Sequence, residues 1–136
     1  MRNNYLAREK YCDENSVYIV GPDGDDGLSG VLTFKLFNYM YQNNDIWVAW
    51  CQHIRTLKGE LGACQSFSEK SLLEKTIRKS KTFESSHLKS FYTKLWKQVK
   101  YEDLFYKDNE MFKAAQDLAM IFPIVEMSGL RNKYIP

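Results

Sequence analysis

Apolar residues recur along much of this chain at the three- and four-residue spacing of amphipathic helices. This spacing predicts three main helices, over Asp45–Lys58, Ser86–Val99 and Glu110–Phe122. Asp45 is a good N-cap residue for the first of them, and Pro123 is expected to stop or bend the last. Their apolar faces are expected to be buried together through Trp47, Trp50, Phe91, Leu95, Phe112 and Leu118.

Shorter helical patterns complete the prediction. Residues 4–14 indicate a short helix, Leu28–Tyr41 a second, and Ser68 begins a third. Residues 17–34 are compatible with a small β-hairpin. The sequence therefore predicts a mostly α fold of five to seven helices. No repeat or linker divides it, so residues 1–136 are expected to form a single domain.

Composition adds few constraints. The chain has 136 residues, of which 44% are hydrophobic, and a formal net charge of +2. No apolar run approaches the roughly 18–20 residues that a membrane span needs. The N-terminus lacks the apolar region of a secretory signal, so we expect the protein to be cytoplasmic at synthesis. Release would then occur by lysis, injection or another non-classical route.

The cysteines indicate free thiols. Cys12, Cys51 and Cys64 are an odd number without a C-x-x-C pair, which favours a reducing compartment. Together with His53 and His87 they match no zinc-site spacing. No local pattern supports a Cys/His nucleophile pair. We predict no metal and no organic cofactor.

Basic residues concentrate in the second half of the chain. Between Ser66 and Lys100 there are nine bases and three acids. The interleaved aromatic residues fall on the predicted apolar stripe, so the lysines are interpreted as a solvated face. This pattern favours a solvated surface over a nucleic-acid site, and a basic face also attracts anionic glycans.

The segment Gly21–Gly30 is an acidic, glycine-rich loop. On its own it is typical of a solvated turn, and its spacing does not fit a calcium-binding EF-hand. Glu14 lies shortly before it, at the end of the first predicted helix. A carboxylic acid and a carboxylate are the pair that glycoside hydrolysis uses, one to protonate the leaving oxygen and one to activate water.

Two stretches carry a resemblance to a known family. The strings "ENS" and "GDDGLSGVLTF", with "DNEMFKAAQDLAMIFPIVEMSGL" near the other end, resemble chitosanases of glycoside hydrolase family 46. The first stretch is similar, more distantly, to phage lysozymes, which implies a lysozyme-like fold. Both comparisons imply that Glu14 is the general acid. The chitosanase comparison implies Asp25 as the base, whereas the lysozyme comparison implies Asp23, with Ser29 positioning water.

These observations predict a glycoside hydrolase that cleaves a β-1,4-linked amino-sugar polymer, either chitosan or peptidoglycan. The predicted catalytic residues are Glu14, Asp25 or Asp23, and Ser29. The alternative is a small non-catalytic helical protein that binds and inhibits another protein. In that case the acidic loop is a recognition loop or only a turn.

Overall fold

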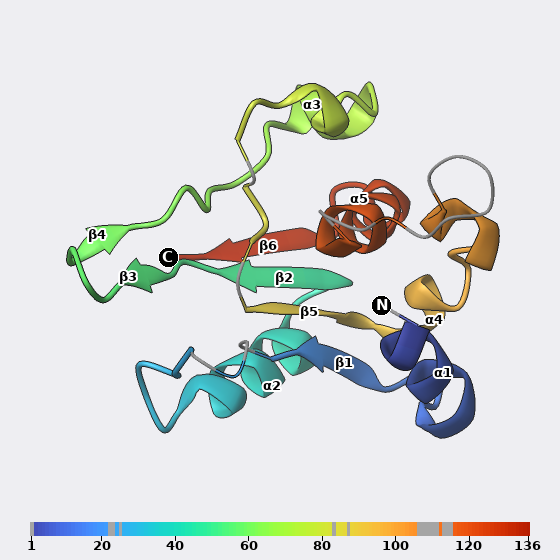
Figure 1. Cartoon of the computed structure of the whole chain (residues 1–136), viewed down its shortest axis with the longest axis horizontal. Coiled ribbons are helices and arrows are strands. Elements are labelled where there is room, and N and C mark those ends of the chain that lie inside the picture. Colours follow the sequence, from blue (N-terminus) through green and yellow to red (C-terminus); the bar gives the residue numbers. More distant parts are fainter. Residues whose placement is uncertain are drawn as a thin grey trace.

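The chain folds around a four-stranded mixed sheet with helices on both faces (Figure 1). This computed structural model describes residues 2–21, 24, 26–82, 84–86, 88–105, 112 and 116–136. The elements in chain order are α1 (Arg2–Tyr11), β1 (Val17–Val20), α2 (Thr33–Asn43), β2 (Val48–Cys51), β3 (Ile54–Arg55), β4 (Glu60–Leu61), α3 (Glu69–Leu73), the 3-10 turn η1 (Ile77–Lys79), β5 (Lys89–Tyr92), α4 (Thr93–Trp96), the 3-10 turn η2 (Tyr101–Leu104), α5 (Gln116–Ser128) and β6 (Asn132–Ile135).

The sheet joins strands that are far apart in the sequence. Its order is β1-β5-β2-β6, with β5 antiparallel to both of its neighbours and β6 parallel to β2. A separate two-stranded hairpin, β3–β4, extends beyond the end of β2 (Figure 1). The prediction of a mostly α fold is therefore wrong, because the fold is of the α+β type.

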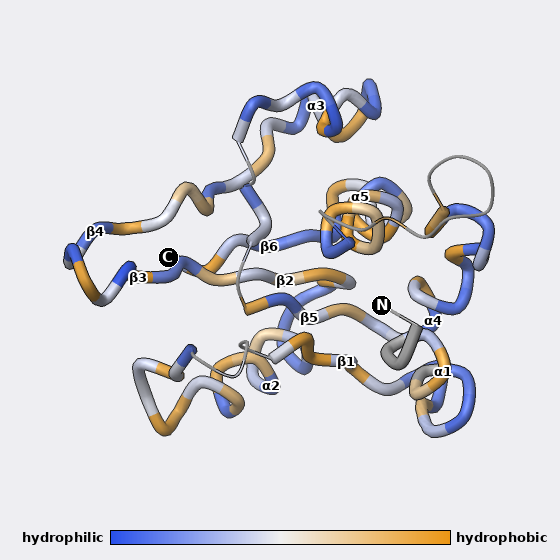
Figure 2. The backbone as a smooth tube through the Cα atoms, in the orientation of Figure 1, coloured by the Kyte–Doolittle hydropathy of each residue, from blue (hydrophilic) through white to orange (hydrophobic). Residues whose placement is uncertain are grey.

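Each face of the sheet has its own apolar core. Val48, Trp50 and Phe91 pack with Ile121 and neighbouring residues of α5 on one face. Ala49 and Leu88 pack with α2 on the other face. Because successive side chains of a strand point to opposite faces, the continuous apolar run of β2 serves both cores. In Figure 2, α5 accordingly carries many hydrophobic residues.

Two of the three main predicted helices are replaced mainly by strands. Asp45–Lys58 contains β2 and β3, and Ser86–Val99 contains β5 followed by the single-turn helix α4. A short apolar run fits a buried strand as well as a helix, and pairing with distant strands decides between them. The prediction of a small β-hairpin within residues 17–34 is also wrong, because β1 pairs with the distant strand β5.

Other helical predictions are confirmed with shifted bounds. α1 and α2 form within or close to the predicted ranges, and Ser68 caps α3 by accepting a hydrogen bond from the Ser71 amide at 3.1 Å. The last predicted helix is present as α5, which runs through Pro123 instead of ending there. The start of the predicted range, including Glu110, lies outside the described residues.

Candidate functional site

The acidic loop leaves the sheet at the carboxyl end of β1. Gly21 directly follows the strand, and Asp26 and Ser29 are exposed further along the loop. Asp23 and Asp25, the two predicted alternatives for the catalytic base, lie outside the described residues. In the sequence, all three aspartates follow the last residue of β1 within six positions.

Glu14, the predicted general acid, lies before β1 and is exposed in a turn. Its backbone carbonyl accepts a hydrogen bond from the Lys94 amide at 3.1 Å, which ties this turn to the start of α4. β1 is four residues long, and a strand rises about 3.3 Å per residue, or roughly 13 Å over this length. Glu14 and the first residue of the loop are thus at opposite ends of one strand.

A buried lysine lies beside the start of the acidic loop. Lys89, the first residue of β5, is opposite Val20 of β1 on one side and Trp50 of β2 on the other. Its side chain is only 7% exposed, and its Nζ lies 3.3 Å from Asp117 Oδ2. A buried ammonium group is costly unless it is paired, so this contact offsets part of the desolvation of Lys89.

Asp117 is the accessible member of this pair. It lies in the first turn of α5, where the positive end of the helix dipole favours a carboxylate. Its side chain remains 46% exposed, so solvent or a substrate can reach it. The Lys89–Asp117 pair therefore places an accessible carboxylate next to a buried positive charge. Lys89 lies at the end of β1, where the acidic loop starts.

Sequence reasoning missed this pair. The density of basic residues predicts a solvated face that includes Lys89, which is wrong for this residue because its side chain is buried. One feature of the sequence does indicate that Lys89 is buried. In the strand "KSFY", side chains alternate between the two faces, so Lys89 shares a face with the apolar Phe91. Asp117 belongs to the stretch that resembles chitosanases, but the resemblance implies no role for it.

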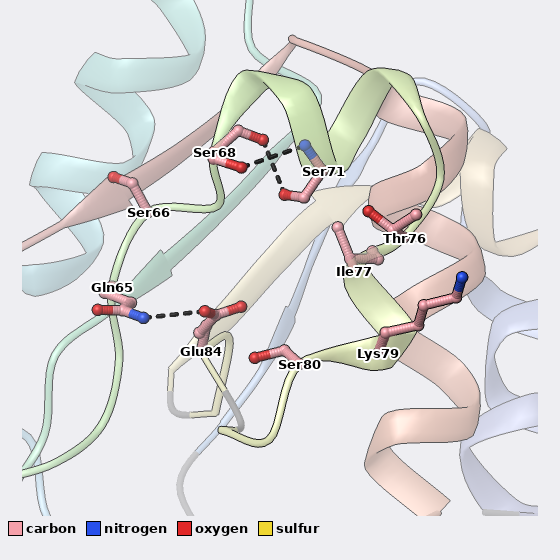
Figure 3. Close-up of a pocket in the computed structure, with 9 residues that line it drawn as sticks. All are labelled: Gln65, Ser66, Ser68, Ser71, Thr76, Ile77, Lys79, Ser80 and Glu84. Atoms are coloured by element: carbon pink, nitrogen blue, oxygen red, sulfur yellow. Dashed lines mark hydrogen bonds between the residues drawn. The ribbon is translucent and has the colours of Figure 1, made fainter.

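A polar hollow of about 510 Å³ lies between α3, η1 and the segment around Glu84 (Figure 3). Gln65 Nε2 donates a hydrogen bond to Glu84 Oε1 across it at 2.9 Å. The lining residues are Gln65, Ser66, Ser68, Ser71, Thr76, Ile77, Lys79, Ser80 and Glu84. These walls offer mainly hydroxyl, amide and charged groups, and none of the lining side chains is an aromatic ring on which a sugar could stack.

The thiol and imidazole groups form a contact of another kind. Cys12, Cys51 and Cys64 carry free thiols, and Cys64 Sγ lies 3.5 Å from His53 Nδ1. His87 lies outside the described residues. Within the part of the chain that the structure describes, no three His, Cys, Asp or Glu side chains come together as a metal site.

Membrane insertion and homology add no further assignment. None of the helices in the described ranges is both long enough and apolar enough to cross a bilayer. No protein-family model, no curated protein and no solved structure matches this chain. The residues themselves therefore provide the basis for a functional proposal.

Proposed function

We propose that this chain is a carbohydrate-active domain that transfers a glycosyl unit at the end of the sheet where the strand β1 stops and the acidic loop begins. One observation supports this location most strongly: Lys89, with its partner Asp117, lies opposite the last residue of β1, directly before the acidic loop. Lys89 is the first residue of β5, so the antiparallel pairing places it beside the end of β1. An accessible carboxylate such as that of Asp117 supplies a group for acid–base catalysis.

In the first version of this proposal the acceptor is water, and the chain hydrolyses chitosan or peptidoglycan. Glu14 donates a proton to the leaving oxygen, Asp25 or Asp23 activates water, and Ser29 orients that water. This version requires the loop to return along β1, because Glu14 precedes the strand. A separation of about 6.5–9.5 Å between the two carboxyl groups would predict inversion at the anomeric carbon.

In the second version the donor is a sugar activated by a phosphate group, and the acceptor is a hydroxyl. The Lys89–Asp117 pair favours this version, because it places an accessible base at the end of β1 that the hydrolase version does not use. Unlike the hydrolase version, and contrary to the expectation of no metal, this version would need a divalent cation, which commonly joins one or two carboxylates to a substrate phosphate; the loop aspartates would supply those carboxylates. Asp117 would then accept the proton of the attacking hydroxyl.

Two assays distinguish these versions. The first measures new reducing ends from chitosan and from purified peptidoglycan. The second measures nucleoside diphosphate released from UDP-N-acetylglucosamine, with a chito-oligosaccharide as the acceptor, in the presence of Mn²⁺ or a chelator. We expect the active assay to lose two or more orders of magnitude with Glu14→Gln for hydrolysis, or with Asp117→Asn for transfer.

Glu102→Gln is the matched control, because Glu102 is an exposed acid on η2 to which neither version of the proposal gives a role. It should leave either activity unchanged. If the folded protein shows neither activity, or if Glu14→Gln and Asp117→Asn are both fully active, the glycosyl-transfer proposal fails. A non-catalytic protein that binds another protein would then be the better description.

A further inference from the structure

The hairpin β3–β4 brings a cysteine and a histidine together outside the proposed glycosyl-transfer centre. His53 precedes β3 and Cys64 follows β4, and the hairpin returns the chain so that Cys64 Sγ lies 3.5 Å from His53 Nδ1. The Gly62 amide donates to the His53 carbonyl at 2.8 Å. Gln52 Nε2 donates to the Cys64 carbonyl at 3.1 Å. The contact is therefore fixed on both sides by hydrogen bonds to the backbone.

Gly62 lies directly against the imidazole ring of His53. A Cβ atom on residue 62 would overlap His53 Cε1, so no other residue fits without moving the ring. The ring lies against the backbone of residue 62, and its Nδ1 is the nitrogen in contact with the thiol. The absence of a side chain at Gly62 therefore leaves room for the ring in the position where its Nδ1 contacts Cys64 Sγ.

A thiol beside an imidazole nitrogen can transfer its proton to that nitrogen, which produces the nucleophilic thiolate. Cys64 is buried, with 4% of its surface exposed, whereas His53 is partly exposed. Cys64 also belongs to the larger apolar core, so the reagent that fits such a thiol best is a small one, and a hydroperoxide is a small oxidant of thiolates. We propose that Cys64 and His53 form a peroxide-sensitive thiol site.

The proposed reaction is balanced without a further component. The Cys64 thiol gives its proton to His53 Nδ1, and the thiolate attacks one oxygen of the hydroperoxide. The S–O bond forms as the O–O bond breaks, and His53 returns the proton to the leaving oxygen. The products are a sulfenic acid at Cys64 and water, or an alcohol from an organic peroxide; the sulfur is oxidised and the peroxide is reduced.

The other two thiols are internal comparators. Burial raises the pKa of the Cys51 thiol to about 11, with a smaller contribution from the charge of Cys64, so little of it is thiolate near neutral pH. Cys12, which directly follows α1, is partly exposed. Accessibility alone therefore predicts that Cys12 reacts first and Cys64 last, whereas the Cys64–His53 site predicts that Cys64 reacts first.

The experiment treats the folded chain with hydrogen peroxide, removes the oxidant with catalase, and then unfolds and alkylates the remaining thiols. Peptide mass spectrometry gives the loss of free thiol at each cysteine over time. We expect Cys64 to be oxidised at least about tenfold faster than Cys51, and faster than Cys12. His53→Gln should slow oxidation of Cys64 by about tenfold or more while leaving Cys12 unchanged.

The comparison among the three thiols needs only the wild-type chain, so it stays decisive even if His53→Gln does not fold. Cys12→Ser is the matched control, because Cys12 follows α1 and belongs to another part of the fold, and it should not alter the rate at Cys64. If Cys64 is oxidised no faster than Cys51, or if folded His53→Gln oxidises at the wild-type rate, the contact is only a structural hydrogen bond. Neither result depends on the proposed glycosyl-transfer activity.

Discussion

At the residue scale, a short chain of buried hydrogen bonds joins α2 to the sheet. The Tyr41 hydroxyl of α2 is 3.0 Å from Ser90 Oγ of β5, and Ser90 Oγ donates to the Ala49 carbonyl of β2 at 3.3 Å. These contacts link a helix and two strands through one buried chain of hydrogen bonds. Since an unsatisfied buried hydroxyl is costly, they also specify how α2 is placed on the sheet.

Tyr41 should make stability depend on pH in the alkaline range. Burial raises the pKa of its hydroxyl above the usual value near 10, while the Ser90 hydrogen bond partly opposes this shift. Above about pH 10 the unfolded chain loses the tyrosine proton and the native chain keeps it, so the free energy of unfolding falls as pH rises. The slope from this residue approaches about 1.4 kcal/mol per pH unit.

We therefore expect Tyr41→Phe to lose stability less steeply than the wild type above about pH 10, as measured by urea unfolding. At neutral pH the variant should be less stable by about 0.5–1.5 kcal/mol, because it lacks the hydrogen bond. Tyr11→Phe is the control, since Tyr11 is 75% exposed. Equal alkaline slopes for Tyr41→Phe and the wild type would contradict the assignment.

At the element scale, one sharp turn connects the helix α5 to the strand β6. α5 ends at Ser128 and the chain turns at once into β6, which pairs parallel to the central strand β2. The turn contains Gly129 with φ of +55°, a left-handed conformation that glycine adopts without steric cost. A glycine at this position therefore allows α5 to be followed directly by a strand of the same sheet.

Gly129→Ala should reduce the free energy of unfolding by about 1–2 kcal/mol, the cost of the left-handed conformation for a residue with a Cβ atom. Among the described residues, no heavy atom lies within 4 Å of the point where that Cβ would stand, so the cost comes from the backbone alone. Urea unfolding measures it. Gly30→Ala is the control, since Gly30 has neither positive φ nor a close neighbour in the same described part of the chain; an equal loss in both variants would contradict the explanation.

At the scale of the whole molecule, two cores share one sheet, and Trp50 is at the centre of the larger core. Its side chain is fully buried against Phe67, and its Nε1 donates to the Gln65 carbonyl at 3.1 Å. Trp47 is only partly buried, with Lys94 and Arg131 over its ring at 4.1 and 4.5 Å. The two tryptophans, which a helix would place on one stripe, therefore have different environments.

Trp50→Ala should cost about 3–5 kcal/mol of folding stability, because it leaves a large cavity at the centre of the sheet. Trp47→Ala should cost clearly less, since solvent already reaches its ring. Thermal or urea unfolding of the two variants measures the difference. Equal losses would favour the single buried helical stripe over the observed strand and would contradict this arrangement.

The sequence by itself determined which residues are apolar, roughly where two short helices lie, and that a helix begins after Ser68. α1, α2 and the Ser68 cap of α3 depend on neighbours within about four residues, so local patterns predict them. The sequence also drew attention to the acidic loop and to Glu14. Whether Glu14 acts with Asp23, Asp25 or Ser29 remains a prediction.

Only the tertiary structure decided the sheet, because strand pairing joins segments that no local pattern connects. "IWVAW" satisfies a helical stripe and a buried strand equally well, and its pairing with β5 and β6 makes it the strand β2. The same long-range pairing buries Lys89 beside Val20 and brings Asp117 to it from 28 residues away. Such contacts depend on how distant segments meet, so the spacing of residues along the chain could not reveal them.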